Sequence, residues 1–391
     1  MLSVIRRARK SLGQTFLVLC AAALSACVPT AGPSTAPAQG NGGSVQVALL
    51  IPSGSGQAQD ELFGQNLENA ARLAMADLRG VQIDLRVYKT GGSPAQASAL
   101  ARQAADEGAQ VILGPFYSEE ANAAGIAVAN SGVNVMAFSN NAAIAGGNVF
   151  VLGQTFDNTA RRLATYAVRN GKSKILIVHD RNVAGETGRA AIERGVSAAG
   201  GSVVGITSYE FSQNGIVQAS QGIVASARSS GATALFLTAD TAGALPLLSQ
   251  LLVDNGIDRA TTQFIGLTRW DVPTASLGLP GLQGGWFALP DPGLYQQYQS
   301  RYTAAFGSAP HPISGLAYDG IAAIGALVKQ GKSNALTGAA LTQGSGFVGV
   351  NGIFRLRSDG TNDRGLAVAE VRAGRVVVVD AAPRSFGGAG F

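Results

Sequence analysis

The sequence predicts an α/β protein with two lobes, each a doubly wound parallel sheet. Short apolar runs alternate with longer segments of helical periodicity, a pattern typical of parallel sheets covered on both faces. The alternation begins again after Gln154, which indicates two such blocks in sequence. The chain has 391 residues, of which 46% are hydrophobic and 14% charged, so we expect large apolar cores.

The first block begins with a β-rich run and ends with the strand at 132–139. Ser93 and Pro94 open a helix that extends to Glu107, with serine as its N-cap and proline in its first turn. Ser118 is expected to cap an Ala-rich helix, whose first turn holds Glu119 and Glu120 near the positive end of the helix dipole. The other expected elements are strands at 44–52, 81–89 and 111–115 and a helix at 61–78.

The second block repeats this order, and the tail differs from both blocks. The tail is expected to hold helices at 295–307 and 314–331 and then hairpins with turns at 358–360 and 372–374. The expected elements of the second block are strands at 174–180, 201–210, 232–240 and 262–268 and helices at 158–171, 187–200 and 242–256, with a further Ala-rich helix before the strand at 232–240.

The first residues of the chain have the order of a secretory signal. Four basic residues precede the apolar run FLVLCAAAL, which is too short for a permanent membrane span. The run ends in LSAC, which resembles the lipobox of bacterial lipoproteins and marks Cys27 for lipidation; the alternative is an ordinary signal peptide with a chance cysteine. We therefore expect a signal peptide over 1–26 and a Pro- and Gly-rich tether over 27–43.

Removal of this signal changes the charge and the cysteine chemistry of the chain. The signal holds four basic residues and no acids, so the formal net charge falls from +5 to about +1. A nucleic-acid-binding function thereby loses its electrostatic support. Cys20 leaves with the signal and Cys27 would carry lipid, so the mature chain has no thiol left for a disulfide.

Motifs that would indicate an enzyme lack the context that their chemistry requires. GSGFVG at 344–349 matches a dinucleotide fingerprint, but a turn and a strand follow it instead of a helix. The two histidines, His179 and His311, are far from any cluster of metal ligands in sequence, and no G-x-S-x-G elbow occurs. We therefore expect no enzyme activity, no metal site and no cofactor.

Five stretches together resemble the type 1 periplasmic binding proteins, in the Leu/Ile/Val-binding branch. They are IPSGSGQAQDELFGQNLENAARLAMADL, VILGPFYSEEANAAGIAVANSGVNVMAFS, ILIVHDRNVAGETGRAAIERGVSAAGG, AYDGIAAIGAL and GVNGIFRLRSDG. The resemblance covers nearly all of the chain after the tether and implies two lobes joined by three crossovers. It implies a first lobe of 44–153 plus 290–345 and a second lobe of 154–289 plus 346–391.

The resemblance also implies a ligand site in a central cleft between the lobes. Its carboxylate side falls on Ser118, Ser139, Asn140 and Asn141, and the loop Ser53–Gly54 should face the same cleft. Its amine side matches less well. Ala184 stands where the family has a tyrosine, which leaves Asp240 and Thr241, with Asp180 either pairing an ammonium or forming a turn.

Two functions remain open from the sequence. The first is a lipid-anchored receptor that passes an amino acid or a similar polar solute to an ABC-type importer. The second is a regulator of cell-wall synthesis that resembles the lipoprotein activators of penicillin-binding proteins. Both place the chain in the periplasm. Val28 after the lipid-bearing cysteine favours the outer membrane of a two-membrane cell, because the aspartate often linked to inner-membrane retention is missing.

Overall fold

The computed structural model describes residues 44–387, which belong to one compact unit. The expected signal peptide (1–26), the lipidation at Cys27 and the tether (27–43) lie outside the described residues. No described helix has the length and apolar character needed to cross a membrane.

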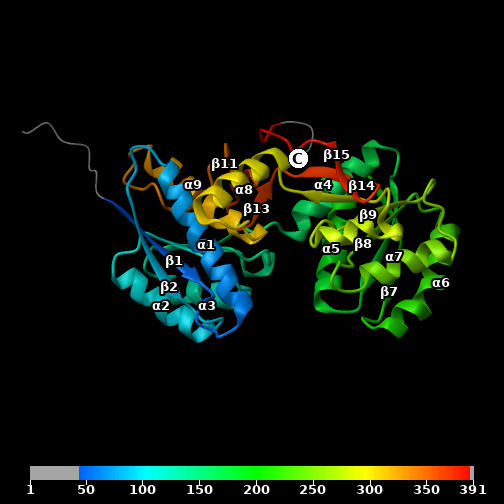
Figure 1. The fold of residues 1–391 in the computed structure, drawn as a ribbon, viewed down its shortest axis with the longest axis horizontal. Coiled ribbons are helices and arrows are strands. Elements are labelled where there is room, and N and C mark those ends of the chain that lie inside the picture. The colour runs from blue at the N-terminus through cyan, green and yellow to red at the C-terminus, as the bar shows by residue number, and fades with distance from the viewer. Residues whose placement is uncertain (1–43, 388–391) are drawn as a thin grey trace, which may run out of the picture. The chain divides into compact units, whose positions relative to one another are not determined.

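Strands and helices alternate through most of the described chain (Figure 1). The strands are β1 (Val45–Ile51), β2 (Ile83–Lys89), β3 (Val111–Leu113), β4 (Asn134–Ala137), β5 (Val149–Val151), β6 (Lys174–Asp180), β7 (Ser202–Tyr209), β8 (Ala234–Leu237), β9 (Gln263–Gly266), β10 (Trp286–Leu289), β11 (Phe347–Gly349), β12 (Gly352–Leu356), β13 (Asn362–Arg364), β14 (Ala367–Arg372) and β15 (Arg375–Asp380). The α-helices are α1 (Ala58–Asp77), α2 (Pro94–Asp106), α3 (Ser118–Ala127), α4 (Phe156–Arg169), α5 (Val183–Ala198), α6 (Gln213–Ser230), α7 (Leu245–Asp254), α8 (Pro292–Phe306), α9 (Gly315–Val328) and α10 (Gly338–Leu341).

The first lobe is built on a parallel sheet of five strands in the order β2-β1-β3-β4-β5. Each face of this sheet has its own apolar core. Leu67 of α1 and Ile321 of α9 belong to the core on one face, whereas Ala101 of α2 and Ala124 of α3 belong to the core on the other (Figure 1). Because both faces are covered, β1 and β3 are buried along almost their whole length.

The second lobe is built on a seven-stranded sheet in the order β15-β14-β10-β9-β8-β6-β7. Its five parallel strands follow the order of the first sheet, and β14 and β15 add to them as an antiparallel pair. Ile192 of α5 lies in the core on one face, and Leu248 of α7 lies in the core on the other. The structure therefore confirms the predicted α/β class with two doubly wound parallel sheets.

The tail supplies parts to both lobes. β11, β12 and β13 form a small antiparallel sheet, and Phe347 and Phe354 lie in the core of the first lobe. β14, which begins at Ala367, pairs with β10 of the second sheet, and β15 pairs with β14. The lobe boundaries remain a prediction, and this packing favours a return to the second lobe near residue 367 instead of 346.

Several local expectations can be compared directly with the structure. Ser93 caps α2 as predicted, because its side chain accepts a hydrogen bond from the Gln96 backbone. Ser118 does not cap α3. It is the first helical residue, and Tyr117 occupies the N-cap position without a side-chain cap. The strands β5 and β10 were not expected, because each is a run of only three or four apolar residues between loops.

A buried ion pair lies where the chain passes between the lobes. Asp319 on α9 accepts hydrogen bonds from the guanidinium of Arg364 at 3.2 Å, from the backbone of Val350 at 2.7 Å and from the Asn351 amide at 3.1 Å. Arg364 also donates from Nε to the carbonyl of Leu152 at 2.7 Å. Arg364 and Asp319 are 5% and 0% exposed, so this network replaces the hydration of both charges.

The Arg364→Met substitution should lower the free energy of unfolding by about 3–5 kcal/mol, because it leaves the Asp319 carboxylate buried without its cation. Urea unfolding of the full chain measures this loss. The double variant Arg364→Met with Asp319→Asn should be less destabilised than the single variant, since no buried charge remains. Equal losses in the two variants would show that the unpaired carboxylate is not the cause.

Candidate functional site

A cavity of about 590 Å³ is lined by residues from both lobes. This volume lies in the range of small-molecule pockets. The lining is largely apolar, with polar groups at a few positions. The residues are Phe116, Tyr117, Ser118, Phe138, Ser139, Asn140, Asn141, Gly153, Gln154, Phe156, Thr159, Leu267, Thr268, Arg269, Pro290, Pro312, Ile313, Leu316, Asn351, Arg364 and Leu366.

The wall from the first lobe holds four of the predicted site residues: Ser118, Ser139, Asn140 and Asn141. Ser118 is the first residue of α3, so its hydroxyl lies beside backbone N–H groups that have no partner within the helix. Ser139 accepts a hydrogen bond from the Asn141 backbone, and Asn141 accepts one from Ala143, which fixes this loop after β4. Hydroxyl, amide and backbone donors thus converge on one side of the cavity.

The wall from the second lobe follows β9. Thr268 donates a hydrogen bond to the carbonyl of Ala239 at 3.2 Å. Arg269 forms a two-point pair with Asp271, with one contact from Nε at 2.7 Å. Only 26% of the Arg269 side chain and 14% of the Asp271 side chain are exposed, so the guanidinium is held in one place. The cavity lining includes Arg269 but not Asp271.

The floor of the cavity consists of the segments that join the lobes. Gly153 follows β5, Pro290 follows β10, and Leu366 precedes β14. Asn351 and Arg364, which hold Asp319, complete the floor. A ligand in this cavity would therefore touch the walls of both lobes and the chain segments between them.

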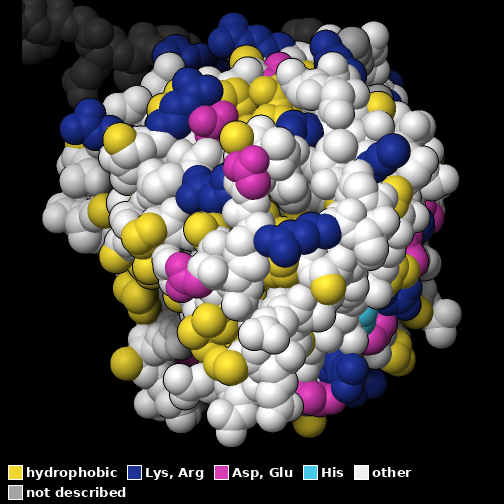
Figure 2. All heavy atoms as spheres, turned by 90° about the vertical axis from the view of Figure 1, so that its right-hand side faces the viewer, with side chains coloured by type: hydrophobic (Ala, Val, Ile, Leu, Met, Phe, Trp, Pro, Cys, Tyr) yellow, Lys and Arg dark blue, Asp and Glu magenta, His cyan; other side chains and the backbone are white. Residues whose placement is uncertain are grey.

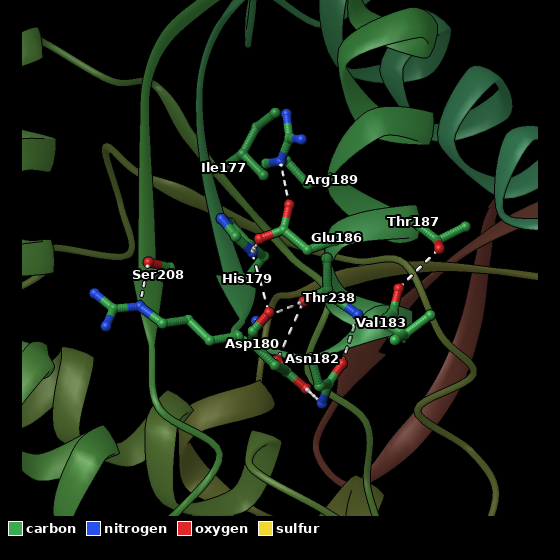
Figure 3. Close-up of polar contacts among 12 residues, drawn as sticks. Ile177, His179, Asp180, Asn182, Val183, Glu186, Thr187, Arg189, Ser208 and Thr238 are labelled. Carbon is green, nitrogen blue, oxygen red and sulfur yellow. Dashed lines mark hydrogen bonds and ion pairs between the residues drawn. The ribbon is translucent and has the colours of Figure 1, made fainter.

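Asp180, the predicted partner of an ammonium, does not line the cavity. It is 7% exposed and accepts hydrogen bonds from the Tyr209 hydroxyl and, at 3.2 Å, from the Thr238 hydroxyl. Burial and this carboxylate raise the pKa of Tyr209, so its hydroxyl remains a donor. In Figure 3, the Asp180 carboxylate contacts Thr238 and Asn182. The nearby Glu186 is directed toward His179 and Arg189. These acids at the end of β6 already have partners within the lobe.

The other predicted residues also lie outside the cavity lining. Asp240 accepts a hydrogen bond from the Gly243 backbone at 2.6 Å, and Thr241 donates to the carbonyl of Val272 at 2.6 Å, so both shape the turn after β8. Ser53 is buried after β1, and the Gly54 backbone donates to Glu61 at 2.6 Å. A ligand-binding role for these four residues and for Asp180 stays a prediction.

The two glutamates that follow Ser118 differ in their surroundings. Both lie in the first turn of α3, as predicted, and Glu119 is exposed. Glu120 is 0% exposed, and neither of its carboxyl oxygens has a hydrogen-bond partner within residues 44–387. The Thr90 hydroxyl lies near Glu120 but donates to the carbonyl of Ile51 at 3.0 Å. Burial raises the pKa of Glu120, and the charge of Asp60 adds to this rise.

The cavity-lining residues that the sequence reasoning missed include two pairs. Thr268 and Arg269 directly follow β9, and the rule that ligands bind at the carboxyl ends of parallel strands could have found them. Asn351 and Arg364 lie in the tail beside short antiparallel strands, where no local signal indicates a site. Their role depends on contacts with residues more than thirty positions away.

The part of the chain at 44–387 contains no group of three or more His, Cys, Asp or Glu side chains placed to hold a metal ion. Figure 2 shows one face of the molecule, on which basic and acidic side chains are interspersed. This face therefore offers no continuous basic patch of the kind that binds nucleic acid.

Comparison with known proteins agrees with this architecture. Residues 44–375 match the family of periplasmic binding proteins, and the chain belongs to this family, as the sequence resemblance predicted. A search of curated proteins gives no match.

Solved structures show the same fold at low identity. An ABC transporter protein from Rhodospirillum rubrum has a TM-score of 0.73 and 18% identity, covering 86% of this chain and 100% of that chain. A substrate-binding protein from Desulfitobacterium hafniense, solved in complex with Leu, has a TM-score of 0.63 and 17% identity over 86% and 100% of the two chains. A solute-binding protein from Rhodopseudomonas palustris, in complex with 3,4-dihydroxybenzoic acid, has a TM-score of 0.60 and 18% identity over 87% and 98%.

Glu120→Gln should make the stability of the protein less dependent on pH. The pKa of Glu120 is raised in the folded state, so wild-type stability falls as the pH rises from the ordinary glutamate pKa toward the raised one. The variant lacks this fall, and its stability relative to wild type should therefore increase with pH across that window. Urea unfolding at a series of pH values measures the difference. Glu119→Gln, at the exposed neighbouring position, is the control and should follow the wild-type pH dependence. A Glu120→Gln curve parallel to wild type would contradict this expectation.

Proposed function

We propose that the chain is a non-enzymatic solute receptor of the cell envelope that delivers a small carboxylate-bearing solute, an amino acid or a related molecule, to an ABC-type importer. The observation that carries this proposal is the cavity between the walls of the two lobes, with Ser118, Asn140 and Asn141 on one side and Arg269 on the other. Donors at a helix N-terminus together with a guanidinium suit a carboxylate. Solutes named for similar structures, Leu and 3,4-dihydroxybenzoic acid, both contain such a group.

The position of the cavity supports a mechanism by lobe closure. A ligand that touches both walls and the floor binds the closed arrangement more tightly than the open one, and it shifts the equilibrium by that difference. The importer would then recognise the closed form. We place the receptor in the periplasm, held by lipid on Cys27 and with the outer membrane as the expected location.

The second candidate function is a regulator that resembles the activators of penicillin-binding proteins. Asp180 and Asp240 favour it, because their carboxylates are engaged within the second lobe and the amine side of an amino-acid site is thereby weakened. In this alternative the fold would bind a cell-wall synthase, with or without a solute.

Thermal unfolding with a library of amino acids and other small carboxylates tests the receptor. A ligand present at 100 times its Kd should stabilise the full chain by about 2.7 kcal/mol. Ser118→Ala should weaken the binding of that ligand by about 10- to 100-fold, because a hydrogen bond to a charged group is lost. Ser300→Ala, on the exposed side of α8, is the matched control and should bind normally. A folded protein that no library member stabilises would count against the receptor.

Affinity capture of cell-wall synthases tests the second candidate. Under the receptor proposal, the chain retains no penicillin-binding protein from a detergent extract of envelope proteins. Specific and saturable retention of one such synthase, combined with no thermal shift by any solute, would favour the regulator.

A further inference from the structure

We infer that the cavity selects a carboxylate with an apolar or aromatic body and without an ammonium group. This inference rests on the proposed solute-receptor function and specifies the class of solute. Free α-amino acids carry both a carboxylate and an ammonium, and a site that desolvates them needs acceptors for the ammonium. The cavity lining offers guanidinium, amide and hydroxyl donors for a carboxylate, but within the described residues it offers no carboxylate to pair with an ammonium.

The lining contains charge of only one sign. Arg269 and Arg364 line the cavity, and no Asp or Glu belongs to the lining within the described residues. Each arginine is paired with a carboxylate that does not line the cavity, Asp271 for Arg269 and Asp319 for Arg364. An ammonium in the cavity would therefore meet two guanidinium groups and no carboxylate. Like charges at short range in a partly desolvated site disfavour binding.

The acids nearest to the carboxyl ends of the second sheet each have a partner within the lobe, and Asp180 is the buried one among them. Asp180 accepts from Tyr209 and Thr238, and Asp240 accepts from the Gly243 backbone. Glu186 pairs with Arg189 at 2.9 Å and lies 3.6 Å from His179 (Figure 3). Recruiting Asp180 for a ligand ammonium would leave the buried Tyr209 hydroxyl without an acceptor, which lowers the net affinity.

No acid of the first lobe belongs to the cavity lining either, although Glu61 and Glu119 are exposed. Asp60 is 7% exposed and accepts a hydrogen bond from Tyr117 at 2.5 Å. Glu120 is fully buried, and burial raises its pKa, which favours the neutral form. Glu61 accepts from the Gly54 backbone. None of the three belongs to the cavity lining.

The remaining surface of the cavity suits an apolar body. Four aromatic side chains contribute to the walls, Phe116, Tyr117 and Phe138 from the first lobe and Phe156 from the start of α4. Phe116 and Tyr117 meet edge to face with ring centroids 4.8 Å apart, so they present a continuous apolar wall beside Ser118. Ile313, Leu316 and Leu267 extend this apolar surface. A ring or branched alkyl group would lie here with its carboxylate toward Ser118 and Asn140.

Two matched pairs of ligands test the inference by titration calorimetry on the full chain. The pairs are 3-phenylpropanoate with phenylalanine and 4-methylpentanoate with leucine, and the members of each pair differ only in the ammonium group. We expect at least one carboxylate without an ammonium to bind, with an affinity at least ten-fold higher than that of its amino acid. Equal affinities, or tighter binding of the amino acid, would overturn the inference and leave the receptor function standing. Failure of all four ligands would overturn the inference and count against the proposed receptor as well.

Two variants, with one control variant, test which residues cause the preference for a carboxylate without an ammonium. Arg269→Gln should lower the affinity for the carboxylate ligand that binds in that titration by about 10- to 100-fold, because the guanidinium is lost from the wall. Arg194→Gln is the matched control, because Arg194 forms a similar two-point pair with Asp157 away from the cavity. A similar loss in both variants would refute a direct role of Arg269.

In Asp240→Asn, the tighter binding of the carboxylate relative to its amino acid should persist. A ten-fold loss there that affects only the amino acid would show that Asp240 pairs an ammonium, contrary to the inference.

Discussion

The contact between Asp319 and Arg364 connects all three passages of the chain between the lobes. Arg364 lies just before the passage into β14 and donates to Leu152, just before the passage into α4. Asp319 also holds Asn351, whose carbonyl accepts from the backbone of Asp291 in the passage into α8. One buried ion pair therefore sets the relative positions of segments that are far apart in sequence. Removing either partner would leave an uncompensated charge at the point where the lobes join.

This arrangement determines which chemical groups line the cavity. Its floor is made by the joining segments, where Arg364 lines the cavity and is paired with Asp319, which does not line it. The walls then determine which solute fits. The first lobe supplies donors at the start of α3 and in the loop after β4, and the second lobe supplies Arg269 beside its own carboxylate partner. Under the further inference, these walls would recognise negative charge better than positive charge, because Asp180 and Asp240 of the second lobe accept hydrogen bonds within that lobe.

Much of the fold was predictable from local patterns, because fully buried parallel strands such as β1 and β6 are long apolar runs and their helices carry capping residues. Short strands such as β5 and β10 were missed, since three or four apolar residues between loops give no period. Ser118 and Asn140 were predicted from the family resemblance, which places a carboxylate pocket after two strands of the first sheet. Arg364 was not predictable, because its function depends on its distance from Asp319 and Leu152, and no local pattern encodes that distance.

The residues of the cavity floor limit how the solute specificity of the proposed receptor could change by substitution. Arg364, Asn351 and Gly153 contact the ligand space and also hold the chain passages, so a substitution at any of them alters stability along with affinity. Asn140 differs from them, because it is an exposed residue of the wall and holds none of these passages. In the proposed receptor, a substitution at such a wall position would therefore change solute affinity with less effect on stability than a substitution in the floor.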